Sequence, residues 1–169
     1  MKKTEYEVID NYLPLDVFHT MANVFDNDEQ NFPWFYNRFV DDHRNGEADD
    51  HFYFAHLLLK NNVINSEFYE SIMPLIDKIY PKALIRVKVN AYPKNGNKLI
   101  RHRTHTDHPF EHKAAIFYLN TNNGKTVLED GTEIDSVANR VLFFNPGKPH
   151  SSTNCTDAKM RFNININYF

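Results

Sequence analysis

Cysteine, glycine and long apolar runs are all scarce in this chain of 169 residues. The single cysteine, Cys155, excludes an internal disulfide and any cysteine-rich zinc site, so we expect a reducing, cytoplasmic setting. With only five glycines, the sequence contains neither GxGxxG nor GxxxxGK[ST], and the common nucleotide-binding loops are therefore absent. No apolar stretch approaches the roughly 18 residues of a membrane helix, and the first residues lack the apolar core of a signal peptide.

Positive charge is not in excess either. The chain has 19 Lys and Arg residues against 22 Asp and Glu residues, a net charge of −3, which does not favour nucleic acid as a partner. Hydrophobic residues make up 41% of the chain and charged residues 24%, as is typical of a soluble globular protein. The length favours one domain, and we predict a single domain over residues 1–169.

The hydrophobic periodicity divides the chain into two parts. Residues 1–83 are predicted to be mostly helical, with one helix over 14–25, whose inward face would carry Leu15 and Phe18. A second helix is predicted after Ser66, a suitable N-cap, with Pro74 expected to kink or delay it. Residues 84–169 change to a period of two, which predicts strands near 86–92, 114–120, 125–129, 139–144 and 161–169.

Turn residues and element order indicate the fold class. Asn122-Asn123-Gly124 and Asp130-Gly131 are predicted to form hairpin turns between strands. Two helices followed by a series of short strands indicate a mainly β (α+β) protein, a sandwich or jelly roll with the N-terminal helices packed outside. In the last strand, Arg161, Asn163, Asn165 and Asn167 alternate with apolar residues. The asparagines are therefore either exposed to solvent or line a wet cavity.

Three residues far apart in the sequence have the right chemistry for a metal centre. In an extended His105-Thr106-Asp107 segment, the first and third side chains point the same way, although such a triplet alone is expected by chance. His150 follows the apolar strand 141–144 and would supply a third ligand. Two neutral imidazoles and one carboxylate form the facial triad suited to non-haem Fe(II). Arg161, inward on the last strand, calls for a buried anion, most often a carboxylate.

The order His105-x-Asp107, His150 and Arg161 on a strand-rich second half resembles the Fe(II)/2-oxoglutarate-dependent dioxygenases, and among them the prolyl-4-hydroxylase-like branch. The resemblance covers residues 84–169, and the first 80 residues match only loosely. Supporting stretches are Tyr92-Pro-Lys-Asn-Gly, Ile116-Phe-Tyr-Leu-Asn, Phe143-Phe-Asn-Pro-Gly-Lys-Pro-His and Arg161 to Phe169.

The resemblance implies a double-stranded β-helix (jelly-roll, cupin-like) core and a defined set of site residues. His105, Asp107 and His150 would ligate the iron, while Arg161 and Tyr118 would bind the distal carboxylate of 2-oxoglutarate. The family pattern also places Tyr92, Asn163 and Asn165 beside the cosubstrate. A competing register through His102 has no carboxylate two residues later, so His105 is preferred.

The implied activity is hydroxylation of a C–H bond with O2, during which 2-oxoglutarate is converted to succinate and CO2. A prolyl residue in a peptide is the leading substrate class, with lysine, a free amino acid or another small molecule, or a modified nucleotide still open, and ascorbate is a candidate reductant. Two other classes compete with the enzyme. One is a non-enzymatic cupin-like protein that binds a metal or a small acid, and the other is a structural jelly roll.

Overall fold

A computed structural model describes residues 6–26, 31–38 and 52–169 of the chain. Its strands and helices, in chain order, are β1 (Tyr6–Ile9), α1 (Leu15–Phe25), β2 (Phe35–Asn37), β3 (Tyr53–Lys60), β4 (Val63–Ile64), a 3-10 helix (Glu67–Ile72), α2 (Met73–Ile79), β5 (Leu84–Pro93), β6 (Lys113–Tyr118), β7 (Asn122–Val127), β8 (Glu133–Ser136), β9 (Arg140–Phe144), β10 (Ser151–Ser152) and β11 (Met160–Tyr168).

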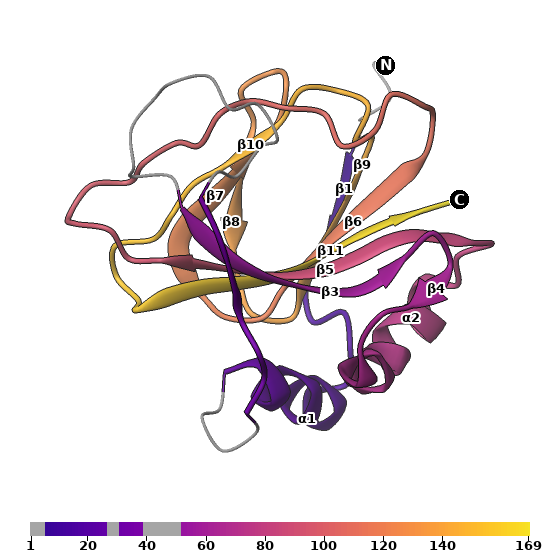
Figure 1. The fold of residues 1–169 in the computed structure, drawn as a ribbon. Helices are drawn as coiled ribbons and strands as arrows, with labels where there is room; N and C mark the ends of the chain where they lie inside the picture. The colour runs from indigo at the N-terminus through magenta and orange to yellow at the C-terminus, as the bar shows by residue number, and fades with distance from the viewer. Residues whose placement is uncertain (1–5, 27–30, 39–51) are drawn as a thin grey trace.

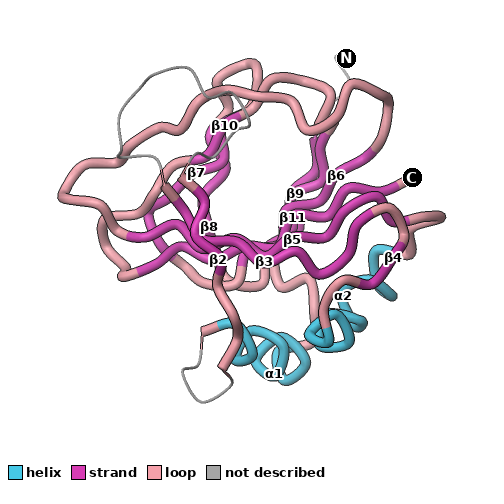
Figure 2. Tube along the Cα trace, in the orientation of Figure 1, coloured by secondary structure: helices cyan, strands magenta, loops and turns pink. Residues whose placement is uncertain are grey.

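Two antiparallel sheets face each other across the molecule (Figures 1 and 2). The larger sheet has the strand order β1-β9-β6-β11-β5-β3-β2, with β4 paired to β3, and the smaller sheet has the order β10-β7-β8. Both helices lie outside, against the larger sheet (Figure 1). This arrangement confirms the predicted jelly roll with external helices. None of the helices in the described residues is long and apolar enough to cross a membrane.

Strand β11 forms the centre of the larger sheet because it pairs with β5 on one side and with β6 on the other. Its apolar residues face the helices: Ile164 and Ile166 are fully buried there beside Val87 and Val89 of β5. Its polar residues face the smaller sheet, together with the polar face of β5. The predicted alternation is therefore confirmed, and the asparagines of β11 point into the interior of the barrel rather than into solvent.

The first helix forms as predicted, but its buried face is shifted. Phe18, Met21 and Phe25 are buried, whereas Leu15, which the spacing placed inward, is 63% exposed because it starts the helix at the edge of the core. The second predicted helix is split in two. Ser66 caps the 3-10 helix through its hydroxyl, and Pro74 then lies in the first turn of α2, where a missing N–H costs no hydrogen bond.

Two further expectations need correction. Asn122, Asn123 and Gly124 do not form a hairpin turn but belong to β7, where the pairing with β8 shifts register. The turn lies later, at Asp130-Gly131, as predicted, and Gly131 takes a φ of 84° there. Residues 6–83 also contribute four strands, β1 to β4; the periodicity left 51–59, the region of β3, open between strand and helix and did not predict the other three. The N-terminal part therefore extends the sheet as well as supporting it.

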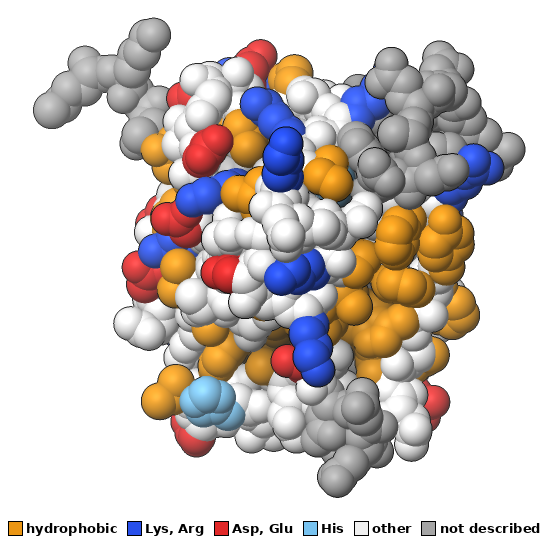
Figure 3. Space-filling view, turned by 90° about the vertical axis from the view of Figure 1, so that its left-hand side faces the viewer, with side chains coloured by type: hydrophobic (Ala, Val, Ile, Leu, Met, Phe, Trp, Pro, Cys, Tyr) orange, Lys and Arg blue, Asp and Glu red, His pale blue; other side chains and the backbone are white. Residues whose placement is uncertain are grey.

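The edge of the larger sheet exposes aromatic side chains. Phe35 and Tyr36 of β2 are 59% and 61% exposed, and the ring of Tyr36 lies against Phe52 and Phe54. The face that includes this edge carries a group of hydrophobic side chains and several Lys and Arg side chains (Figure 3). Apolar surface is therefore available at the border of the sheet, next to the groove described below.

The outer face of the larger sheet should determine global stability. Phe117 of β6 has no exposed surface and packs against the rings of Tyr12 and Phe18, so Phe117→Ala should lower the free energy of unfolding by about 3–5 kcal/mol. Urea unfolding followed by circular dichroism measures the change. Leu15→Ala on the exposed side of α1 is the control and should change the free energy of unfolding by no more than about 0.5 kcal/mol. Equal losses for the two variants would contradict this assignment of the core.

Candidate metal centre and cosubstrate pocket

The backbone places His105 and His150 side by side. The two residues form an isolated antiparallel bridge in which each N–H donates to the carbonyl of the other at 2.9 Å. Residues directly opposite each other in such a pair present their side chains on the same face. Their ring centroids are 4.6 Å apart. His150 lies 43 positions after Asp107 in the sequence, and the local β pairing of His105 with His150 brings it back to the His-x-Asp segment.

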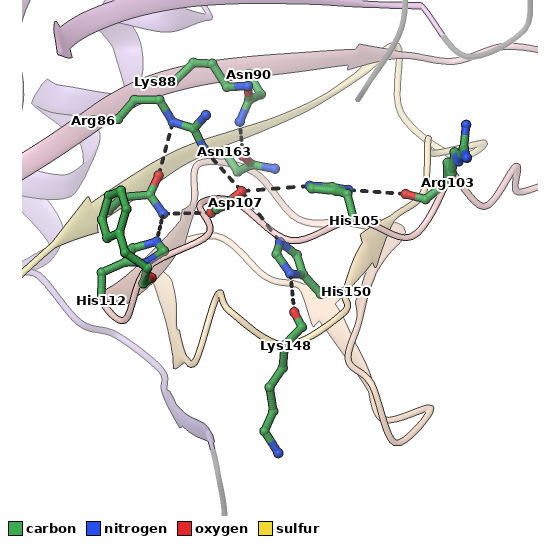
Figure 4. A network of polar contacts seen from close by, with 12 residues as sticks. Arg86, Lys88, Asn90, Arg103, His105, Asp107, His112, Lys148, His150 and Asn163 are labelled. Carbon is green, nitrogen blue, oxygen red and sulfur yellow. Dashed lines mark hydrogen bonds and ion pairs between the residues drawn. The ribbon is translucent and has the colours of Figure 1, made fainter. Parts of the chain in front are cut away.

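Hydrogen bonds to backbone carbonyls orient both imidazoles. Nδ1 of His105 lies 3.2 Å from the carbonyl of Arg103, and Nδ1 of His150 lies 3.0 Å from that of Lys148 (Figure 4). A carbonyl can only accept, so each Nδ1 carries the proton and each Nε2 presents a lone pair. This is the tautomer that a metal ligand needs, and such carbonyl contacts are the usual way of fixing it.

Asp107 completes the set. Its Oδ1 lies 3.9 Å from Nε2 of His105 and 3.9 Å from Nε2 of His150 (Figure 4). The ligand atoms of the three residues all lie within 4.8 Å of one another, and they form the group in the described residues that could hold a metal ion. The structure thus brings together the three predicted ligands. His102, the competing residue, is turned away: it stacks on Tyr92 and bonds to the hydroxyl of Ser152.

The electrostatic environment favours an ionised Asp107 and a neutral His150. Burial raises the pKa of Asp107, but the positive Arg86, with His150, Asn167 and His105, outweighs burial and lowers the pKa to about 2. The carboxyl is therefore ionised at neutral pH. Burial lowers the pKa of His150 below its usual value, and the opposing pull of Asp107 does not cancel it. A neutral imidazole beside an ionised carboxylate is the combination that binds a divalent cation.

Arg161 lies on the inner face of β11, the face that also carries its asparagines, and is completely buried. Its guanidinium donates to the hydroxyls of Ser136 and Thr126 and to the carbonyl of Thr153. None of the carboxylates in the described residues forms an ion pair with it, so the buried charge has only neutral partners. A buried cation of this kind is costly unless an anion compensates it.

Aromatic rings and a glycine shape the space around Arg161. The rings of Tyr92 and Tyr118 lie 5.3 Å and 5.7 Å from its guanidinium carbon, and the Tyr118 hydroxyl donates to Thr126 at 2.8 Å. Burial raises the pKa of both tyrosines, so their hydroxyls stay protonated and can donate. Gly124 lies so close that a Cβ there would be 2.5 Å from Cδ of Arg161. Strand β7 therefore needs a glycine at this point to leave room for the arginine.

The asparagines predicted to face the cosubstrate lie on the inner face of the sheet. Asn163 is buried and accepts a hydrogen bond at 2.9 Å from Asn90, its neighbour on β5. Oδ1 of Asn90 and Oδ1 of Asn165 are buried and accept no hydrogen bond from the described residues. Buried polar atoms without partners are rare in native proteins and indicate a place where a ligand or water binds.

Sequence reasoning missed two residues of the site, Arg86 and Asn167. Nη2 of Arg86 lies 3.2 Å from Oδ1 of Asp107, and Nδ2 of Asn167 donates to Oδ2 of Asp107 at 2.7 Å. The alternation of polar and apolar residues did place both side chains toward the site. Arg86 lies on the same face of β5 as Tyr92, and Asn167 lies on the same face of β11 as Asn163. Only the pairing of β5 with β11, which the sequence does not give, reveals that they converge on Asp107.

A groove of about 880 Å³ lies beside β3 and shares one residue, Asp107, with the triad. Its lining also includes His108 and aromatic and aliphatic side chains such as Phe35, Tyr53 and Leu57. Arg86, Lys88 and Lys60 add positive charge and Glu67 a negative one. The groove is large enough for a drug-sized molecule or a few residues of a peptide.

Comparison with solved structures identifies the fold as that of the 2-oxoglutarate/Fe(II) oxygenases, the double-stranded β-helix. No family model and no curated protein matches the sequence. A Trichoplax adhaerens prolyl hydroxylase, solved with a hypoxia inducible factor peptide, matches with a TM-score of 0.72 and 16% identity, over 99% of this chain and 84% of that one.

Two further structures match over nearly the whole chain. A 2OG-Fe(II) oxygenase-family oxidoreductase from Burkholderia pseudomallei gives a TM-score of 0.67 at 16% identity, over 99% of this chain and 86% of that one. A viral collagen prolyl hydroxylase from Paramecium bursaria chlorella virus-1, solved with 2OG, gives 0.60 at 14% identity, over 99% and 98%. The predicted fold class is confirmed, and at these identities the likeness concerns the fold.

The buried state of His150 should make stability depend on pH. Because its pKa is lowered in the folded state, the unfolded chain takes up a proton near pH 6.5 that the folded chain resists. The free energy of unfolding of the cation-free protein should therefore fall as the pH drops from 7.5 to 5. For this one group the slope is at most about 1.4 kcal/mol per pH unit. Urea unfolding at stepped pH should give a shallower slope for His150→Gln, and identical slopes would contradict the assignment.

Proposed function

We propose that this chain is an Fe(II)- and 2-oxoglutarate-dependent dioxygenase that hydroxylates a C–H bond, with a prolyl residue in a peptide as its substrate class. The observation that carries the proposal is the completely buried Arg161 without a carboxylate partner in the described residues. It lies on the strand face that also carries Asn167, the partner of Asp107. A dicarboxylate that chelates a cation at the triad and extends toward Arg161 accounts for both features.

The triad residues fit a facial metal centre. Nε2 of His105, Nε2 of His150 and Oδ1 of Asp107 would hold Fe(II) and leave the opposite side of the ion open. Bound there with 2-oxoglutarate and O2, iron would supply the oxidation of the substrate C–H bond, coupled to release of succinate and CO2. The carbonyl contacts orient both imidazoles, burial keeps His150 neutral, and the neighbouring positive charge keeps the Asp107 carboxylate ionised.

The pocket residues fit the cosubstrate. The guanidinium of Arg161, which donates to two neutral hydroxyls, could instead donate to the distal carboxylate of 2-oxoglutarate. That contact would compensate its buried charge. The protonated hydroxyl of Tyr118 lies beside it as a further donor, and the ring of Tyr92 forms a wall. Asn163 and Asn165 are proposed to line the path between Arg161 and the metal. The buried pocket would also exclude bulk water from the reacting centre.

The peptide substrate is proposed from the groove and from the fold. Asp107 belongs to the lining of the groove, and Phe35 and Tyr53 offer aromatic surface to a prolyl ring. One structure with this fold, the Trichoplax adhaerens enzyme, was solved with a peptide.

We further propose a reducing, cytoplasmic location, which is consistent with the buried free thiol of Cys155. Ascorbate would serve as a reductant in assays.

Metal and cosubstrate binding can be tested without knowing the substrate. Anaerobic addition of Fe(II) and 2-oxoglutarate should produce a weak visible charge-transfer band, and His105→Ala should abolish it because one of the three ligands is lost. His19→Ala, on the exposed side of α1, is the matched control and should keep the band. Absence of the band in the unmodified protein, together with no succinate formed with any prolyl peptide, would refute the enzyme. A band without O2-dependent turnover would favour the cupin-like binding protein.

The role of Arg161 has its own test. Arg161→Met should weaken 2-oxoglutarate binding to the metal-loaded protein by about 1.5–3 kcal/mol, the contribution of a charge-assisted hydrogen bond. Titration calorimetry under anaerobic conditions measures the loss, and Arg140→Met, which removes an arginine paired with Asp10 at the surface, is the control. Unchanged affinity in Arg161→Met would show that the cosubstrate does not reach this arginine.

A further inference from the structure

The carboxylate of Asp107 is held at both oxygens before any cation binds. Oδ2 accepts the 2.7 Å hydrogen bond from Asn167, while Oδ1 faces the two histidines and lies 3.2 Å from Nη2 of Arg86 (Figure 4). Only 4% of the Asp107 side chain is exposed, so water does not compete with these partners. The two oxygens therefore have different environments, one directed to the metal position and one engaged elsewhere.

The orientation of Asn167 is unambiguous even though its amide oxygen and nitrogen have the same shape. Nε of Arg86 lies 3.1 Å from one end of the amide, and since arginine only donates, that end must be the oxygen. The other end is then the NH2 group, which faces Oδ2 of Asp107. Arg86 thus contacts Asp107 directly with Nη2 and also fixes the donor that holds the second oxygen.

His112 supports the same orientation from the other side. Its Nδ1 lies 2.8 Å from the carbonyl of Phe110 and must carry the proton, so Nε2 is an acceptor. That Nε2 lies 3.3 Å from Nδ2 of Asn167, which can donate to it and to Asp107 with its two hydrogens. Asn167 is completely buried between β5 and β6, so its side chain cannot turn away.

We propose that Arg86 and Asn167 are positioning residues for Asp107, which present a single carboxylate oxygen to the cation and keep the second oxygen from coordinating. The proposal rests on the metal centre proposed above. Its consequence is the number of open positions: a carboxylate bound through both oxygens would occupy one more place on the ion. If Oδ2 of Asp107 does not coordinate, the three protein ligands would occupy three of six coordination positions on the ion. The other three would then be available for O2 and for a cosubstrate that binds through two atoms.

Asn167→Ala tests the positioning without removing a charge. We expect Co2+, added alone to the full chain and measured by calorimetry, to bind about 10- to 100-fold more weakly, the usual cost of losing a partner of a metal ligand. The visible spectrum of bound Co2+ should also change, because Oδ2 is then free to coordinate. Asn154→Ala removes another buried asparagine amide, one that bonds to the backbone of Ile100 and not to Asp107, and should match the unmodified protein in affinity and spectrum.

Arg86 variants separate orientation from charge. Arg86→Met and Arg86→Lys should both weaken Co2+ binding, since neither side chain can contact Asp107 and Asn167 together. Arg140→Met removes the same charge from an arginine that is paired with Asp10 instead of Asp107, and is the matched control. If Arg86 acted only by repelling the cation, Arg86→Met would bind Co2+ more tightly than the unmodified protein, and that result would overturn the proposal.

The outcomes distinguish this inference from the proposed function. Failure of the unmodified protein to bind Co2+ or Fe2+ would overturn the metal centre itself and the positioning role with it. Binding by the unmodified protein with unchanged affinity and spectrum in a folded Asn167→Ala would overturn the positioning role alone. Thermal melting of the cation-free variants reports folding, and if Asn167→Ala does not fold, Arg86→Lys decides, because the Arg86 side chain is 23% exposed and tolerates replacement more readily.

Discussion

The pairing of β11 between β5 and β6 is the constraint on which the rest of the molecule depends. Because alternate residues of a strand point to opposite faces, this one strand supplies Ile164 and Ile166 to the core under the helices and Arg161 and Asn167 to the interior of the barrel. A shift of the pairing by one residue would exchange the two sets. It would bury three asparagines and an arginine against the helices, so the hydrophobic core and the site enforce the same register.

The grouping of the three proposed ligands was predictable in part because an extended His-x-Asp segment brings its two side chains to one side. The third residue was chosen from the resemblance to the 2-oxoglutarate-dependent dioxygenases. This residue is His150, and a backbone bridge to His105 brings it into place. The order of residues along β11 likewise predicted its two faces, because strand periodicity is a property of the sequence itself. The general architecture followed from the same periodicity.

Features set by pairing between distant segments were not predictable. Nothing near Arg86 in the sequence indicates Asp107 as its partner, since their contact requires β5 to lie beside β11 and the 105–107 segment to lie across both. Strands β1 and β2 were missed for a related reason. β1 and β2 are short edge strands, and their positions depend on β9 and β3, which offer backbone hydrogen bonds to them. The Asn122–Gly124 segment has turn composition, but the space beside Arg161 requires Gly124 within a strand.

Arg86 and Arg161 lie on the inner face of the larger sheet but differ in how their charge is compensated. Arg86 has a carboxylate at 3.2 Å, so its charge is compensated within the protein and it is available to orient that carboxylate. The hydrogen-bond partners of Arg161 among the described residues are hydroxyls and a carbonyl, and these neutral groups do not compensate its charge. Burying an uncompensated guanidinium opposes folding. Its presence near the start of β11, an inner strand of the larger sheet, is therefore the strongest structural support for the anion site proposed above.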